Sequence, residues 1–149
     1  MHWIHYGALL LFLTAAAVCD SRDGHIPDII NYCGIAVGLL SACFADGLIN
    51  AVLDVLLISG GMFWLAMIFE SLTHREGMGF GDVKLSGVLG AYLGVADSMR
   101  VITYAAWLAV LCEILRKNFS RRRQIPFAPY ILGGATIHEI CSLLTSHRC

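Results

Sequence analysis

The sequence predicts an all-α polytopic membrane protein with about six transmembrane helices. The first observation is composition, because 58% of the 149 residues are hydrophobic and only 14% are charged. Soluble domains carry about 25% charged residues, and a chain this short exposes much of its surface to its solvent. The second observation is pattern: the apolar stretches are long, and they lack the alternation in ten-residue segments that is typical of membrane β-barrels.

Six apolar stretches are predicted to span the bilayer and to form one membrane-embedded domain over residues 1–149. A helix needs about 20 mostly apolar residues to cross the hydrocarbon core. The first stretch could be a signal peptide, but it begins MHWIHYG without a basic region, so we expect a retained helix. The fourth is short and is expected to have interfacial or pore-facing ends. The predicted spans are 3–19, 26–45, 48–69, 83–96, 99–115 and 125–144.

The Lys and Arg residues predict the orientation of these spans. With the N-terminus outside, eight of the ten basic residues fall on the inner side, a strong bias under the positive-inside rule. Six spans return the C-terminus to the outside. The inner residues are Arg22, Arg75, Lys84, Arg116, Lys117, Arg121, Arg122 and Arg123; the outer ones are Arg100 and Arg148. We interpret the basic run 121–123 as a membrane anchor, and the net charge of −1 gives no indication of nucleic-acid binding.

Two acidic motifs lie at the inner ends of predicted spans. The first begins at Asp20 and runs to Asp28, and the second is Gly79-Phe80-Gly81-Asp82-Val83-Lys84-Leu85. Asp20 and Asp82 are 62 residues apart (82 − 20), yet the predicted topology puts both on one face. A carboxylate at such a depth is costly to keep ionised, so it usually faces protein or water and often has a function. Two close carboxyl groups resist joint ionisation and can share a proton, which suits acid–base hydrolysis of a peptide bond.

The glycines around Asp82 also suit a site that binds peptide backbone. Gly79 and Gly81 can adopt positive φ and allow close approach of another backbone. Gly90 and Gly94 follow at a spacing of four, a pattern suited to tight helix packing.

At these residues the chain resembles the type IV prepilin peptidase family, which includes the archaeal preflagellin peptidases. The resemblance rests on Asp20 six residues before Ile26-Pro27, on the Gly-x-Gly-Asp motif 79–82 followed by Lys84, and on Ile125-Pro126-Phe127-Ala128-Pro129 opening the last span. It implies an inner-membrane GxGD aspartyl peptidase that removes the basic leader of a prepilin or pseudopilin at the cytoplasmic face. Asp20 and Asp82 carry over as the catalytic pair, and Gly79, Gly81 and Lys84 as substrate-binding or supporting residues. No cofactor and no metal are implied.

Two departures from the family pattern bear on function. The residue after Ile-Pro is commonly Asn, but here it is Asp28, which we expect, like Asp23, to be a solvated or helix-capping acid. Larger bacterial members add a cytoplasmic region with paired Cys-x-x-Cys motifs that is linked to N-methylation. None of the six cysteines here forms Cys-x-x-Cys, so we expect neither a structural zinc site nor methyltransferase activity.

Other readings of the acids remain open from the residues alone. Asp82 could serve only as the N-cap of a helix, a role that Asp fills well. The chain could be a small proton-coupled transporter or channel in which Asp54, Asp82 and Glu113 form a relay. It could also be an inactive scaffold that binds pilus-assembly proteins. A relay needs acids at mid-membrane, whereas the motif acids are predicted at one face.

Overall fold

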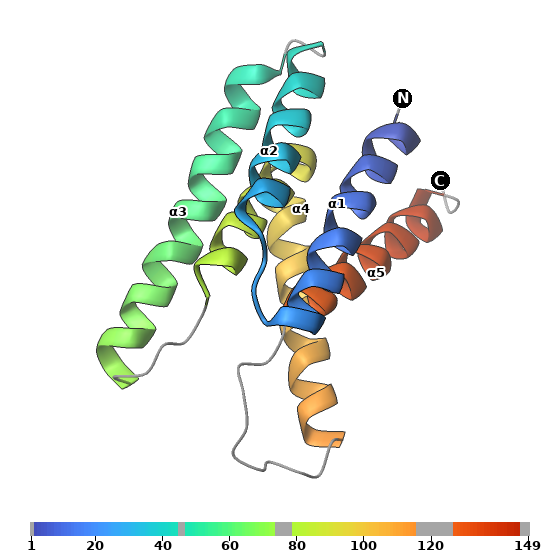
Figure 1. Cartoon of the computed structure of the whole chain (residues 1–149). Coiled ribbons are helices and arrows are strands. Elements are labelled where there is room, and N and C mark those ends of the chain that lie inside the picture. Colours follow the sequence, from blue (N-terminus) through green and yellow to red (C-terminus); the bar gives the residue numbers. More distant parts are fainter. Residues whose placement is uncertain (1, 45–46, 74–78, 116–126, 147–149) are drawn as a thin grey trace.

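A computed structural model describes residues 2–44, 47–73, 79–115 and 127–146, and these residues form five α-helices and no strand. The predicted all-α class is therefore confirmed. The helices are α1 (His2–Asp23), α2 (Asp28–Cys43), α3 (Leu48–Thr73), α4 (Phe80–Leu115) and α5 (Ala128–Ser146). Figure 1 shows the N- and C-termini on the same side of the molecule, and the end of α1 beside the start of α5 farther down the bundle.

Helix α4 contains the predicted fourth and fifth spans, divided by one residue that is not helical. Gly94 has φ 75° and ψ 176°, a conformation that is essentially restricted to glycine. Figure 1 shows the chain passing behind α2 and then running back down after this break. The segment before Gly94 packs on α2 and α3, whereas the segment after it packs on α5. The predicted boundary at 96–99 lies just beyond the observed one.

Small residues let these helices approach closely. A Cβ on Gly90 would lie 2.8 Å from the carbonyl oxygen of Asp54, and a Cβ on Gly38 would lie 2.7 Å from Cβ of Ala91. The predicted role of Gly90 in tight packing is thus confirmed, whereas Gly94 provides the break in α4. The core of α1, α4 and α5 is filled by fully buried apolar side chains: Leu9, Leu13, Leu85, Leu89, Val101 and Ile131.

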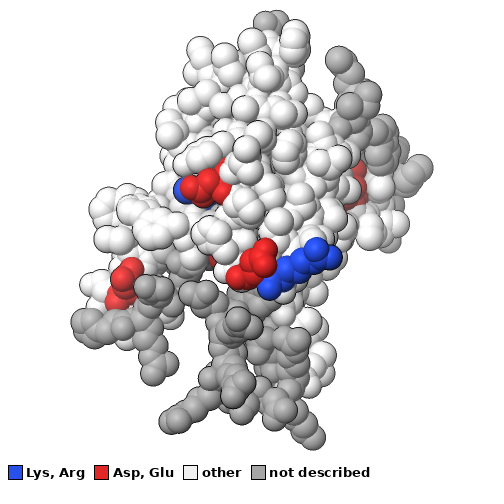
Figure 2. Space-filling model, viewed as in Figure 1, with Lys and Arg blue, Asp and Glu red and all other residues white. Residues whose placement is uncertain are grey.

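The outer surface of α3 is apolar along its length. Within the described part of the chain, α3 and the Phe80–Cys112 part of α4 are long and apolar enough to cross a membrane. Figure 2 shows a face almost free of charged side chains, with a few acidic and basic groups in separate patches. An apolar surface of this extent indicates contact with lipid. The exposed large side chains of α3 include Leu53, Leu56, Leu57, Trp64, Leu65, Ile68, Phe69 and Leu72.

Candidate active site

Asp20 lies in the last turn of α1 and accepts a hydrogen bond from the first residue of α5. Its side chain is buried, with 9% of the residue exposed. The backbone N–H of Ala128 donates a hydrogen bond of 3.0 Å to Oδ2 of Asp20. Ala128 is the first residue of α5, so the carboxyl group occupies a helix N-terminus, where free N–H groups and the helix dipole favour an anion. Gly24, at φ 63°, then turns the chain toward α2.

Asp82 is the third residue of α4 and lies inside its first turn. Its N–H donates to the carbonyl oxygen of Gly79 at 3.0 Å, which is the first hydrogen bond of the helix. The side chain is half-buried. The N-cap reading of Asp82 is therefore wrong, because the helix already begins at Phe80. A carboxylate in a first turn is still favoured by the helix dipole.

The structure brings these two predicted carboxyl groups to the same end of the helix bundle. Asp20 and Asp82 interact electrostatically, although they lie on α1 and α4. The segment that links α1 to α2 lies beside both, because Ile26 is buried and packs on Gly81, the residue before Asp82. Two carboxyl groups that interact inside a largely apolar helix bundle are the arrangement in which one proton is shared.

The two motif glycines differ in what surrounds them. A Cβ on Gly81 would lie 3.3 Å from Cβ of Ile26, so glycine allows the close approach of these two segments. Gly81 does not use positive φ, which among the described glycines is found at Gly24 and Gly94, so that part of the prediction is wrong. A Cβ on Gly79 would lie 3.7 Å from Oδ2 of Asp82, so Gly79 leaves the space beside this carboxyl group free.

Lys84 reaches α2. Its Nζ lies 2.7 Å from Oδ1 of Asp28 and 5.3 Å from the centre of the Tyr32 ring, which places the cation over an aromatic face. Asp28 is the first residue of α2, and about half of its side chain is exposed. The prediction of a solvated acid did not include its ion pair with Lys84. The pair joins the start of α2 to α4 at a residue two positions after Asp82.

Sequence reasoning missed two groups at this end of the molecule. One is the N–H of Ala128, a backbone group that carries no side-chain signal, although the motif 125–129 that contains it opens the last predicted span. The other is Asn31, which is fully buried and directs its amide Nδ2 toward the carbonyl oxygen of Gly81 at 3.4 Å. The available signal for Asn31 was a lone amide side chain inside an apolar span.

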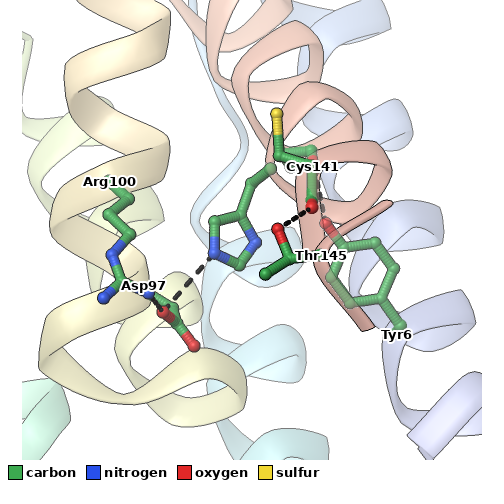
Figure 3. Close-up of polar contacts among 7 residues, drawn as sticks. Tyr6, Asp97, Arg100, Cys141 and Thr145 are labelled. Atoms are coloured by element: carbon green, nitrogen blue, oxygen red, sulfur yellow. Dashed lines mark hydrogen bonds and ion pairs between the residues drawn. The ribbon is translucent and has the colours of Figure 1, made fainter. Parts of the chain in front are cut away.

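The opposite end of the bundle holds a separate set of polar contacts. Figure 3 shows Asp97 beside Arg100, with which it forms an ion pair. Nε2 of His138 lies 3.4 Å from Oδ1 of the same Asp97. In the same view Tyr6 donates a hydrogen bond to the backbone of α5, at the carbonyl oxygen of Ala135. These contacts join α1, the second segment of α4 and α5, so they stabilise the bundle at the end away from Asp20.

The relay alternative also rests on Asp54 and Glu113. Asp54 lies beside the Gly94 break, at the end of the first segment of α4 opposite to Asp82. The side chain of Glu113 lies outside the described residues. Among the residues that the structure describes, no group of three His, Cys, Asp or Glu side chains could hold a metal ion.

Comparisons with known proteins agree with one another. Residues 7–114 match the model of the type IV leader peptidase family. The chain is 32% identical over 138 residues to the prepilin leader peptidase/N-methyltransferase of Xanthomonas campestris, an alignment that covers 87% of this chain and 47% of the relative. It is 29% identical over 143 residues to the leader peptidase HopD of Escherichia coli, covering 92% of this chain and 89% of HopD. No solved structure matches.

The chain spans about half the length of the prepilin leader peptidase/N-methyltransferases that it matches, and most of the length of HopD. The family match covers α1 from Gly7, all of α2 and α3, and nearly all of α4, so it includes both carboxyl groups of the site. This membrane protein belongs to the type IV leader peptidase family.

Proposed function

We propose that this protein is an aspartic endopeptidase that removes the leader of type IV prepilin-like proteins, with Asp20 and Asp82 as the catalytic pair. The observation that carries the proposal is the placement of these two acids, from α1 and α4, at one end of the bundle, near enough for the charge of Asp20 to act on Asp82. The names of the relatives, which are prepilin leader peptidases, support the substrate class.

The pair provides the two proton transfers that peptide hydrolysis needs. One carboxyl group, ionised, takes a proton from the attacking water, and the other, protonated, donates to the oxygen of the scissile carbonyl. The N–H of Ala128 orients Asp20, and Gly79 leaves space beside Asp82 through which a substrate backbone can approach. Gly81 and Lys84 are proposed to support Asp82 indirectly, because Gly81 packs against Ile26 and Lys84 binds Asp28 at the start of α2.

The catalytic end is proposed to face the cytoplasm from the inner membrane, with both termini outside and six membrane crossings. The break at Gly94 supports the sixth crossing, because it divides α4 into two segments with different packing partners. Arg22 and Lys84 lie near the proposed catalytic end, and Arg100 lies near the other, as the positive-inside rule requires. The basic leader of the substrate would then meet the enzyme on the cytoplasmic side.

The experiment that tests this function is co-expression with a prepilin-type precursor in a host that lacks its own prepilin peptidase. We expect the precursor to be shortened, with mass spectrometry locating the new N-terminus immediately before the mature apolar segment. A precursor that stays at full length while the enzyme is present in the membrane would reject the proposal.

The same spectra test whether residues 1–149 methylate their product. We expect the new N-terminal amine to be unmethylated, since the chain aligns along most of HopD, whose name is that of a leader peptidase alone. A product heavier by one methyl group would contradict this expectation. Co-expression with a prepilin leader peptidase/N-methyltransferase gives the methylated reference.

Lys84 is expected to act through Asp28. Lys84→Met and Asp28→Asn should each slow cleavage modestly, and the double variant should be no slower than Lys84→Met alone, because both changes remove one contact. The measurement is a double-mutant cycle: the cleavage rates of the wild type, the two single variants and the double variant, each normalised to enzyme level. Additive losses, or a loss confined to Lys84→Met, would mean that Lys84 contacts the substrate instead.

A further inference from the structure

Asn31 is a polar side chain that the chemistry proposed above does not use. It lies in the first turn of α2 and has no exposed surface. A buried amide side chain costs free energy unless its donors and acceptors are paired. Its burial beside the proposed catalytic end of the bundle therefore requires an explanation.

The side chain of Asn31 contacts the peptide that precedes Asp82. Its Nδ2 donates to the carbonyl oxygen of Gly81 at 3.4 Å, a long hydrogen bond between residues 50 positions apart. Ile26 packs on the α-carbon of the same glycine. Gly81 is thus contacted by Ile26, in the link between α1 and α2, and its carbonyl oxygen is held by Asn31, in the first turn of α2. The same link begins at α1, four residues after Asp20.

Stability alone does not account for Asn31. Its Oδ1 is buried and has no hydrogen-bond partner among the described residues. An unpaired buried acceptor destabilises a fold, so a leucine of similar size would serve packing better at this position. By contrast, an apolar side chain could not hold the carbonyl oxygen of Gly81. The amide of Asn31 is therefore explained by its hydrogen bond to the carbonyl oxygen of Gly81, which orients that peptide.

We propose that Asn31 is a positioning residue, which fixes the Gly81–Asp82 peptide and so directs the Asp82 carboxyl group toward Asp20. The inference rests on the proposed peptidase function and adds a residue to it. The mechanism is geometric, because acid–base catalysis requires the two carboxyl groups and the water to be in reach of one another. A misplacement of about 1 Å can lower the rate on the order of 10²-fold.

The test compares Asn31→Leu with Ser86→Ala in the purified full chain, reconstituted in lipid nanodiscs and supplied with a prepilin-type precursor. Ser86 is a matched control, because it is also buried but its hydroxyl bonds within α4, to the carbonyl of Val83. Asn31→Leu should lower kcat by roughly 10- to 100-fold with KM unchanged, and its thermal midpoint should be no lower than that of the wild type. Asn31→Gln keeps the amide donor and should recover part of the rate.

Hydrogen exchange separates this inference from the peptidase proposal. In Asn31→Leu, the amides of Asp82 and Val83, which bond to Gly79, should exchange faster, while those of α3 and α5 keep their wild-type rates. A wild-type protein that cleaves nothing rejects the peptidase function and leaves the exchange result to decide the role of Asn31. Unchanged exchange at these amides, a wild-type kcat in Asn31→Leu, or a rise in KM alone would each overturn the inference.

Discussion

Asp20→Asn and Asp82→Asn are each expected to leave a prepilin-type precursor uncut. The change replaces one oxygen by nitrogen, so an asparagine at position 20 can still accept the hydrogen bond from the N–H of Ala128. What is lost is the carboxyl group that takes or gives a proton, and such a loss lowers a rate by about 10²–10⁴-fold. The measurement is the ratio of precursor to mature product on a gel over time, at equal enzyme level in the membrane.

Three other acids provide the controls. Asp23→Asn changes an exposed residue in the same turn region, and Asp97→Asn changes the acid that pairs with Arg100 at the opposite end of the bundle. Both are expected to process the precursor at close to the wild-type rate. Asp54→Asn tests the transporter alternative, because a proton relay through Asp54, Asp82 and Glu113 would need Asp54, which lies on α3, whereas cleavage at the end that holds Asp82 would not. Full processing by either Asp20→Asn or Asp82→Asn would remove that residue from the mechanism.

Gly134→Ala is expected to disrupt the contact between α4 and α5. A Cβ at this position would lie 2.5 Å from the carbonyl oxygen of Val101 and 2.9 Å from the backbone nitrogen of Ala105. Both neighbours are backbone atoms, so no side chain can rotate away. Overpacking of this kind lowers the free energy of unfolding by about 1–3 kcal/mol. We expect a clear fall in the thermal midpoint of the purified protein in detergent.

The matched control is the same substitution at Gly61 of α3. A Cβ there meets nothing within 4 Å, and alanine is the better helix former, so Gly61→Ala should keep or raise the midpoint. Equal midpoints for the two variants would show that α4 and α5 are not in the tight contact described here. Because α5 also carries Ala128, Gly134→Ala is expected to lose cleavage activity together with stability.

The helices could be predicted from the sequence because lipid demands long apolar stretches, and these are easily read. The predicted spans 26–45 and 48–69 correspond to Asp28–Cys43 and Leu48–Thr73, within a few residues at each end. The predicted boundary between the fourth and fifth spans lies a few residues beyond the break at Gly94. The sequence does not locate this break, because the residues around Gly94 are as apolar as the helices on either side. Its backbone conformation has no signature beyond the glycine itself.

The site could be predicted only where side chains carry the chemistry. Asp20 and Asp82 stood out as acids at the ends of apolar spans, and the topology placed them on one face. The contacts that orient them did not stand out. The bond to Asp20 comes from a backbone N–H 108 residues away, and Lys84 pairs with an acid 56 residues distant, so neither leaves a local pattern.

The hydrogen bond from Ala128 to Asp20 also has a consequence for shortened forms of the protein. The family match ends at residue 114, which would suggest that a shortened protein could function without its last helix. Yet the first amide of that helix anchors one of the two acids. A truncation at residue 114 would therefore leave Asp20 without this donor, and we expect such a protein to lose the proposed cleavage activity.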